Sequence, residues 1–326
     1  MPYTPRNPNL RCRRMSSQAV PAHAEIPPPR VEEVSRGIYA YIQMDGSWFL
    51  NNAGAVAGSR SATVIDTTGT EARARAVHAA VREVTQHPVS ALINTHSHGD
   101  HTHGNFMFAP ASAIIASERC RREIIAAGHG SHALFPMVDF GDCPVAPPTV
   151  TFDDRLTVYV DDLRIELIFA GPAHTTNDIV AWIPERKLLF SGDIIFNGGT
   201  PFALGGSVAG WLSALDRIEE LGAETIVPGH GEICGPEVIG EVRAYLRWLQ
   251  ETARPAFAKG TPPLELASGL DLGRFAELHD RERLVANLHR VYSELRGEPP
   301  GTPLDHVQMF REMLIYNGNQ PLRCLA

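Results

Sequence analysis

Lysine is nearly absent from this sequence of 326 residues, which contains only Lys187 and Lys259. Almost all positive charge is therefore carried by arginine, a composition that we attribute to a coding bias of the source genome. Acidic residues outnumber basic ones, and the formal net charge at pH 7 is −8. Because proteins that bind nucleic acids generally are basic, this charge argues against that function class.

The cysteines form no C-x-x-C pair, and their number is odd. They are Cys12, Cys120, Cys143, Cys234 and Cys324. This pattern indicates free thiols in a reducing cytoplasm rather than a disulfide framework. No stretch approaches the apolar length of a transmembrane helix, and the first thirty residues lack the apolar region of a secretory signal. We therefore expect a cytoplasmic protein that does not bind membranes, with residues 1–30, rich in proline and arginine, as a disordered tail.

From Val31 the hydrophobic pattern alternates between strand-like and helix-like segments. The first half predicts strands over 37–43, 49–58, 61–66 and 88–94, with a helix over 71–85. The second half predicts strands over 156–160, 163–171, 178–184, 188–193 and 224–232, with a helix over 211–221. Each half ends as strands, a helix and a strand, and each last strand delivers histidines at its C-terminal edge. This weak internal duplication implies two β-sheets packed face to face, helices outside, and a cleft where the sheet edges meet.

Beyond residue 236 the pattern predicts only helices, which cover 237–258, 281–296 and 303–316. A connector rich in glycine and proline lies at 260–273. We expect this C-terminal region to pack on the core, to shape the substrate entrance or to form a homodimer.

The segment "NTHSHGDHTHGN", residues 94–105, contains four histidines and an aspartate. In an extended segment, residues two apart point the same way, so His96 and His98 can bind one ion together. Asp100 and His101 follow where the loop turns, and can face a second ion. Zn²⁺ favours imidazole and carboxylate ligands at about 2.0–2.2 Å. The segment therefore predicts a site for two metal ions.

Four motifs in order, each following a predicted strand, resemble those of the metallo-β-lactamase-fold hydrolases. They are "THSHGDH" (95–101), "GPAHTTND" (171–178), "FSGD" (190–193) and "VPGHGE" (227–232). The resemblance spans about residues 36–235 and implies an α/β fold, the αββα sandwich, as a catalytic domain over 31–236 with a C-terminal helical extension over 237–326. It implies one metal on His96, His98 and His174, another on Asp100, His101 and His230, and a bridge through Asp193.

The cofactor implied by this ligand set is two Zn²⁺ per chain, with iron or manganese as alternatives. After two carboxylates and a bridging hydroxide are counted against two divalent cations, a positive charge remains to hold an oxyanion. Metal binding lowers the pKa of water from about 15.7 towards ~7 and so provides a nucleophile at neutral pH. The expected chemistry is metal-assisted hydrolysis by a zinc-bound hydroxide, in which Asp100 also has a catalytic role.

Other polar and aromatic residues are weaker candidates. Asp66, in "VIDTTG", matches the family's first motif, in which an aspartate supports the site, but it also fits an ordinary turn. His103, His129 and His132 lie where they can flank the cleft, and each also fits a surface or structural histidine. Trp48 fits either a flap residue over the substrate or a core residue.

The residue at position 193 separates kinds of hydrolase. Asp193 resembles the glyoxalase II type of thioester hydrolase, whereas one major class of β-lactamases has a cysteine there and a lysine at the position of Phe196. A departing thiolate, with a parent pKa of about 8.5, needs little help from a general acid. We therefore predict cleavage of a thioester or related acyl bond. Glyoxalase II-like, lactone and β-lactam hydrolysis, a mononuclear iron persulfide dioxygenase, a nuclease and a binding module without catalysis remain alternatives.

Segments outside the metal motifs resemble the second-ring cyclase/thioesterases of bacterial aromatic polyketide pathways, which serve antibiotic biosynthesis. These are "SWFLNNAG" (47–54), "FNGGTPF" (196–202), "AYLRWLQ" (244–250) and "ERLVANLHRVYSELRG" (282–297). The resemblance implies a carrier-bound poly-β-ketone as substrate and an acyl carrier protein as partner. Because carrier proteins are acidic, local arginines would have to supply the contact. The candidate patches are Arg119, Arg121 and Arg122, or Arg281, Arg283 and Arg290.

Overall fold

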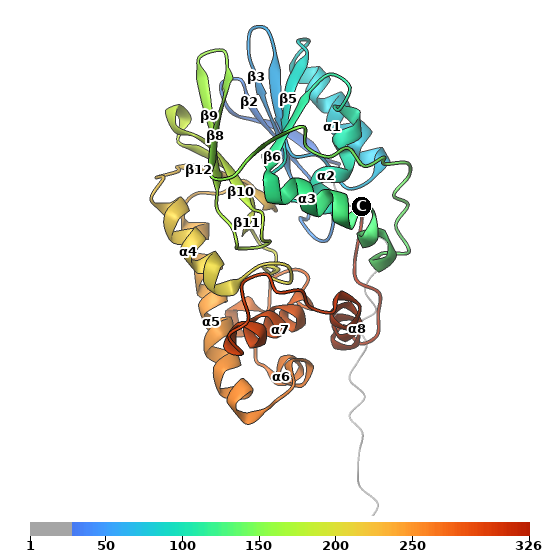
Figure 1. Ribbon diagram of the computed structural model, residues 1–326, viewed down its shortest axis with the longest axis vertical. Coiled ribbons are helices and arrows are strands. Elements are labelled where there is room, and N and C mark those ends of the chain that lie inside the picture. The colour runs from blue at the N-terminus through green and yellow to red at the C-terminus, as the bar shows by residue number, and fades with distance from the viewer. Residues whose placement is uncertain (1–27) are drawn as a thin grey trace, which may run out of the picture.

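Two β-sheets lie face to face in the computed structural model, which describes residues 28–326 (Figure 1). The first sheet has seven strands in chain order: β1 (Arg30–Ser35), β2 (Ile38–Ile42), β3 (Ala53–Ala57), β4 (Ala62–Ile65), β5 (Val89–Ile93), β6 (Ala113–Ser117) and β7 (Val150–Phe152). The second has the order β12 (Thr225–His230), β11 (Leu188–Phe196), β10 (Ile179–Ile183), β9 (Leu163–Phe169) and β8 (Arg155–Val160). Strands β4 to β7 run parallel to one another, and so do β11 and β12; the remaining neighbours are antiparallel.

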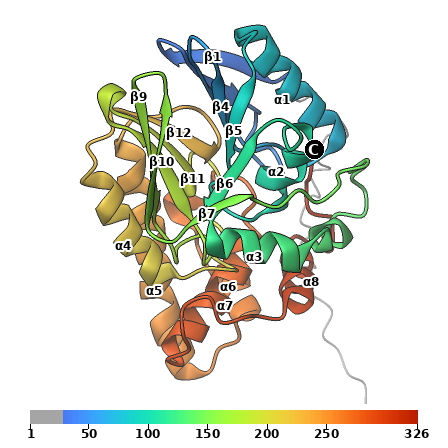
Figure 2. The same ribbon diagram turned by 45° about the horizontal axis from the view of Figure 1, so that its top comes forward.

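Eight α-helices surround the sheets in the described part of the chain. They are α1 (Glu71–Val84), α2 (Gly99–Thr102), α3 (Glu118–Ala127), α4 (Val208–Glu219), α5 (Glu237–Lys259), α6 (Pro263–Gly269), α7 (Arg283–Leu295) and α8 (His306–Tyr316). Short 3₁₀ helices are η1 (His103–Met107), η2 (Gly130–Leu134), η3 (Pro184–Arg186) and η4 (Gly273–Phe275). Helices α1 and α3 pack on the first sheet, and α4 and α5 pack on the second. Helices α6, α7 and α8 gather at one end of the sandwich (Figures 1 and 2).

Strand β10 shows how the sequence specifies the layers. All five of its residues are buried. Ile179, Ala181 and Ile183 join the core between the two sheets, whereas Val180 and Trp182 join the core beneath the helices. Because strand side chains alternate between faces, a strand covered on both sides reads as a continuous apolar run. The segment "DIVAWIP" therefore marks a strand inside a layered α/β structure.

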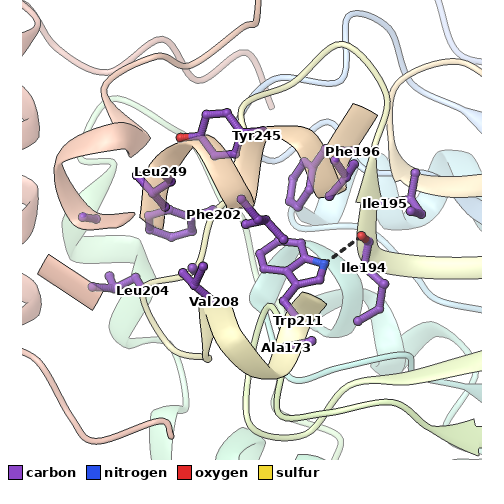
Figure 3. Packing of buried hydrophobic residues seen from close by; sticks show 14 of the residues in the cluster. Ala173, Ile194, Ile195, Phe196, Phe202, Leu204, Val208, Trp211, Tyr245 and Leu249 are labelled. Atoms are coloured by element: carbon purple, nitrogen blue, oxygen red, sulfur yellow. Dashed lines mark hydrogen bonds between the residues drawn. The ribbon is translucent and has the colours of Figure 1, made fainter. Parts of the chain in front are cut away.

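The core beneath the helices extends from the second sheet into the C-terminal helices. It contains Trp211 of α4, Leu246 of α5, Leu288 of α7 and Met309 of α8. Figure 3 shows Trp211 packed among residues of β11 and the 202–208 segment, with its indole N–H donating to the carbonyl oxygen of Ile194 at 3.0 Å. The C-terminal helices therefore bury apolar surface against the second sheet and α4.

The expected fold, an αββα sandwich with a helical extension, is confirmed. One expectation was wrong, because the 260–273 connector contains α6, which begins at a proline pair that can open a helix. Helix α4 begins at Val208, three residues before the predicted start, because Ser207 caps it through the amide of Gly210. The predicted tail falls mostly on residues 1–27, outside the described residues, and Arg30 already belongs to β1.

Within residues 28–326, every helix is too short or too polar to cross a membrane. The four cysteines in the same range, Cys120, Cys143, Cys234 and Cys324, are free thiols, as expected, and Cys12 lies outside it.

Candidate metal centre

Four strand ends bring the seven predicted ligands together. His96 and His98 follow β5, and the chain then turns into α2, which carries Asp100 and His101. The remaining three ligands come from the second sheet: His174 lies between β9 and β10, Asp193 lies within β11, and His230 ends β12. Their ligand atoms form two groups, within each of which all atoms lie within 4.8 Å of one another: His96, His98, His174 and Asp193, and Asp100, His101 and His230.

The carboxylate of Asp193 lies between the two groups. Its Oδ2 is 3.2 Å from His174 Nε2 and 3.5 Å from His230 Nε2, and its Oδ1 is 3.1 Å from His101 Nε2. Asp100 Oδ2 lies 3.3 Å from His230 Nε2. One carboxylate thus faces histidines of both groups, which is the arrangement of a bridging ligand.

Several converging atoms have no hydrogen-bond partner although they are buried. These are His96 Nε2, His101 Nε2 and Asp193 Oδ1. Buried polar atoms are otherwise nearly always paired, so each such atom calls for an explanation. Imidazole nitrogens and carboxylate oxygens that point at one another in a closed space suit divalent cations of the zinc type. The residues present therefore fit a divalent-metal centre.

The opposite ring nitrogens of four histidines are held by the protein. His96 Nδ1 lies 3.1 Å from the Thr95 hydroxyl, and His101 Nδ1 lies 2.9 Å from Asp66 Oδ2. His174 Nδ1 lies 2.5 Å from the Phe202 carbonyl oxygen, and His230 Nδ1 lies 3.0 Å from that of Gly46. Such contacts fix the tautomer in which Nε2 keeps its lone pair for a metal.

Asp66 does more than end a strand. Its Oδ1 accepts from the Thr95 amide at 2.7 Å, and its Oδ2 accepts from the Thr95 hydroxyl at 2.7 Å while facing His101. The residue is buried and has a φ of 58°, in the left-handed region that aspartate adopts more readily than most residues. Asp66 therefore orients His101 and the start of the histidine segment, as the resemblance implied.

Burial keeps three of the histidines neutral. It lowers the pKa of His174 to about 3, lowers the pKa of His98, and lowers the pKa of His96 well below its usual range. A neutral imidazole is the form that binds a metal. These rings therefore need no deprotonation before they bind a cation at neutral pH.

The carboxylates and the other two histidines form a charged set. Burial alone would raise the pKa of Asp193, but the charges of His230 and His101 hold it well below its usual range. Burial likewise opposes ionisation of Asp100, whose pKa is lowered by His101. Burial is the largest influence on His230 and lowers its pKa, but Asp193 and Asp100 together outweigh burial and raise the pKa to about 9. The pKa of His101 is raised in the same way, by Asp193, Asp66 and Asp100 together against burial. Both carboxylates are therefore ionised and ready to balance cationic charge.

A glycine allows the second sheet to bring its ligands this close. A Cβ on Gly229 would lie 2.0 Å from Asp193 Oδ1 and 2.7 Å from the backbone carbon of Gly192. Any side chain at position 229 would therefore push Asp193 away from His230. The glycine of the "VPGHGE" motif is required by this approach of β11 to β12.

Residues 46–230, more than half of the chain, match the family described as the metallo-beta-lactamase superfamily. The chain belongs to the metallo-beta-lactamase superfamily. The matched segment includes all seven ligands of the candidate centre and ends at His230.

Relatives within this superfamily differ in their named activities. The chain is 30% identical over 182 residues to the 2,4-dinitroanisole O-demethylase subunit alpha of Nocardioides sp., covering 54% of this chain and 51% of that protein. It is 31% identical over 149 residues to the hydroxyacylglutathione hydrolase of Rhodospirillum rubrum, covering 46% and 48%. The chain thus spans about half the length of these two relatives.

A solved metallo-beta-lactamase from Pontibacter korlensis superposes with a TM-score of 0.57 at 20% identity, covering 68% of this chain and 99% of that one. The likeness supports the superfamily fold, and it leaves roughly a third of the present chain outside the superposition.

The other candidate histidines form a separate cluster. His103 Nδ1 lies 3.2 Å from the Gly69 carbonyl oxygen and 3.3 Å from His132 Nε2, and His129 stacks on His132. None of the three belongs to either group of ligand atoms. They pack beside the candidate centre and are not among its candidate ligands.

A cavity of about 670 Å³ opens beside the ligands His98, Asp100, His174, Asp193 and His230. Its wall includes a group of aromatic side chains, those of Trp48, Phe49, Phe135, Phe196, Phe202 and Phe310. Trp48 is both a core residue, 7% exposed, and part of this wall, so the two alternatives for it are compatible. Phe310 comes from α8, so the C-terminal helices contribute to the cavity beside the candidate centre.

Sequence reasoning missed several residues that hold the centre. The carbonyl groups of Phe202 and Gly46 carry no signal, because every residue has one. Asn52, within "SWFLNNAG", donates to the carbonyls of Pro228 and Gly231 on either side of His230, at 3.0 and 2.8 Å. The asparagine pair in that segment was the available signal for this role.

The last residues of the sequence also hold the loop that carries Gly46. Arg323 Nη1 contacts Asp45 Oδ2 at 2.5 Å, and the backbone of Cys324 pairs with that of Trp48 in an isolated β-bridge. Arg73 of α1 donates to the carbonyl oxygen of Leu325 at 2.7 Å. Loop 44–50 is thus fastened from outside the matched superfamily segment.

Asp178 fastens the loop that carries His174, and its pKa predicts a pH dependence. It accepts from the amides of Ala173 and Thr175 and from the Thr175 hydroxyl. Burial outweighs these bonds and raises its pKa from 3.8 to about 7. The folded protein therefore holds a proton that the unfolded chain has released above pH ~4, so this group stabilises the fold at low pH and the benefit is lost as the pH rises to ~7.

The Asp178→Asn side chain cannot ionise. We therefore expect the variant to be less stable than the parent by a smaller margin at pH 8 than at pH 5. The difference between the two pH values should be about 3 kcal/mol, from about two pH units at 1.36 kcal/mol each. Urea unfolding of both metal-free proteins measures it. An equal stability difference at both pH values would contradict the shifted pKa.

Proposed function

We propose that this protein is a divalent-metal-dependent hydrolase that cleaves a thioester or related acyl bond. The observation that carries the proposal is the position of Asp193, whose carboxylate faces histidines of both ligand groups at 3.1–3.5 Å. We further propose two Zn²⁺ per chain, one held by His96, His98 and His174 and one by Asp100, His101 and His230. Bound metals of this kind supply a Lewis acid and an acidified water.

The residues around the centre favour a thiolate as the leaving group. Asp100 lines the cavity and is ionised, so it can accept a proton from an attacking water. The other carboxylate among the ligands, Asp193, is also ionised, so neither of the two is a proton donor for a leaving group. A thiolate departs without protonation, whereas an amine needs it. The hydroxyacylglutathione hydrolase relative, whose name describes an acylated thiol, supports the same assignment.

The environment of Phe196 argues against a β-lactam as the main substrate. Its ring stacks on His230, with ring centroids 5.2 Å apart and planes within 9°. An aromatic ring at this point in the cavity offers no charge to an antibiotic's carboxylate. The position instead favours a flat apolar group in the substrate.

The finer proposal is a cyclase/thioesterase acting on a carrier-bound aromatic polyketide in the cytoplasm. The large aromatic cavity supports it, because such a substrate is bulky and flat.

Among the two arginine patches, Arg283 and Arg290 are buried and cannot dock a carrier protein, so that alternative was wrong. Arg119 and Arg122 on α3 are exposed, and we propose α3 as the docking surface for an acyl carrier protein. The homodimer and the division into a catalytic domain, 31–236, and a helical region, 237–326, stay proposals.

Metal analysis combined with a substrate panel tests the function. We expect a colourless protein containing zinc, inactivated by a chelator and restored by zinc, with kcat/KM for aryl thioesters at least about a hundredfold above that for lactones and β-lactams. Highest turnover on β-lactams would overturn the thioester assignment. An iron-containing protein that consumes oxygen with a persulfide would overturn the hydrolase assignment.

A further inference from the structure

Two buried arginines on one face of α7 line the cavity. Arg283 and Arg290 are seven residues apart, close to two helical turns, and are only 2% and 1% exposed. Both lie beyond residue 230, outside the segment shared with the superfamily. The difference that matters here is whether a carboxylate lies in direct contact with the guanidinium group.

Arg283 is balanced. Its Nη2 lies 2.8 Å from Asp280 Oδ2, and its Nη1 donates to the Thr200 carbonyl oxygen at 3.0 Å. Its guanidinium also lies 4.0 Å from the ring centroid of Trp48, whose indole N–H donates to Glu282. Arg283 therefore has a counter-charge and holds the Trp48 wall in place.

Arg290 lacks such a partner. Its Nη2 donates to the carbonyl oxygens of Leu204 at 2.6 Å and Thr302 at 2.8 Å, and its Nη1 to the Ser293 hydroxyl at 3.4 Å. Its Nε has no hydrogen-bond partner, and no ion pair joins it to any carboxylate within residues 28–326. A buried charge is unfavourable when no counter-charge is in direct contact with it, so a molecule with such a residue gains when a ligand supplies the anion.

His306, a titratable group that also lines the cavity, neither balances the positive charge of Arg290 nor adds to it. His306 also lines the cavity, and burial followed by the charge of Arg290 lowers its pKa, so it is neutral at pH 7. Glu123 lies at the exposed rim, and Asp100 and Asp193 belong to the metal centre. Glu294 and Glu298 act on Arg290 from beyond ion-pair distance, and burial outweighs them, so the pKa of Arg290 is lowered. Arg290 is therefore a positive charge on this wall with no carboxylate in direct contact among the described residues.

A short series of contacts connects Arg290 to the metal centre. Leu204, whose carbonyl it binds, is two residues after Phe202, whose carbonyl holds His174. Leu204 and Gly205 line the cavity together with Gly301 and Leu304, on either side of Arg290's contacts. An anion in this part of the cavity would interact with the guanidinium through a low-dielectric interior, where charges act strongly even without direct contact.

We propose that Arg290 provides the counter-charge for an anionic oxygen group of the substrate, so that the substrate class is an acyl compound with a flat apolar body and a second, negatively charged oxygen substituent. The inference rests on the proposed function, because it takes this cavity as the substrate site. It adds that the C-terminal helices select the substrate by charge as well as by shape.

A matched pair of fluorescent probes tests this without turnover. Anilinonaphthalene sulfonate and N-phenylnaphthylamine share a flat apolar body and differ in the anionic group. With the zinc-loaded full chain, we expect the sulfonate to bind at one site at least about tenfold tighter than the neutral probe, as an added charge-assisted interaction allows. In Arg290→Gln the Kd of the sulfonate should rise about tenfold while that of the neutral probe stays within about twofold.

Arg247→Gln on α5 is the matched control, because it removes the same charge at an exposed residue that does not line the cavity. It should leave both Kd values unchanged. Arg290→Lys, which keeps the charge, should retain part of the preference.

A second measurement does not depend on how the variants fold. In the parent protein, naphthalene sulfonate should displace the bound sulfonate probe, and naphthalene should not. Equal binding of the two probes by the parent, or equal weakening of both in Arg290→Gln, would overturn the proposal. Because binding is measured directly, a failed preference leaves the hydrolase assignment standing, and a failed thioester panel leaves a measured preference standing.

Discussion

Replacing Asp193 by alanine is expected to abolish metal binding at the shared position and hydrolysis together. The carboxylate lies within 3.1–3.5 Å of histidine nitrogens from both ligand groups, so its loss removes a ligand from each and leaves cations crowded without their counter-charge. Loss of several kcal/mol of transition-state stabilisation corresponds to a fall in kcat/KM on the order of a thousandfold. Elemental analysis and thioester assays on the same preparation measure both effects.

Asp66→Asn is the informative companion, because Asp66 reaches the centre only through His101 and Thr95. Loss of such a supporting contact costs about 10- to 100-fold in metal affinity, so excess metal should restore most of the activity. The Asp193→Ala variant should not recover under the same conditions. Full metal content in Asp193→Ala would disprove the bridging role.

Trp211→Ala should be among the most destabilising single substitutions in the chain. The side chain is fully buried, and its N–H donates to the Ile194 carbonyl (Figure 3). Its ring centroid lies 5.7 Å from that of His174. Removing a buried tryptophan leaves a cavity and costs about 3–5 kcal/mol. Urea unfolding of the metal-free protein measures the loss.

Two further variants separate the contributions at this position. Trp211→Phe keeps most of the packing and leaves the Ile194 carbonyl without its donor, so it should cost about 1–3 kcal/mol. Ser213→Ala, at an exposed position of the same helix, should change stability by less than about 0.5 kcal/mol. A loss below about 1 kcal/mol in Trp211→Ala would show that the site collapses to fill the space.

The sequence predicts the layered fold and the ligand set better than it predicts what orients the ligands. Spacing of two places His96 and His98 on one side of an extended segment, and the resemblance adds His174, Asp193 and His230 from distant motifs. The groups that hold the far ring nitrogens include two backbone carbonyls, those of Phe202 and Gly46. Their positions depend on loop conformation, which no residue type specifies.

The arginines of α7 show the same limit for helices. Helical spacing predicts that Arg283 and Arg290 share a face, but it does not say whether that face meets solvent. Arginine normally lies at the surface, so the docking interpretation was the ordinary one, and it was wrong because α7 is enclosed by α5, α6 and α8 and by the cavity wall. Only the tertiary arrangement decides between a charged surface and a buried cation.

The fastening of loop 44–50 by residues 323–325 connects one end of the polypeptide to the imidazole of His230. Arg323 grips Asp45, and the next residue, Gly46, presents the carbonyl that faces His230 Nδ1. A displaced tail would therefore tilt a ligand ring whose own neighbours were untouched. A substitution at Arg323 is accordingly expected to affect the imidazole of His230 through Asp45 and Gly46.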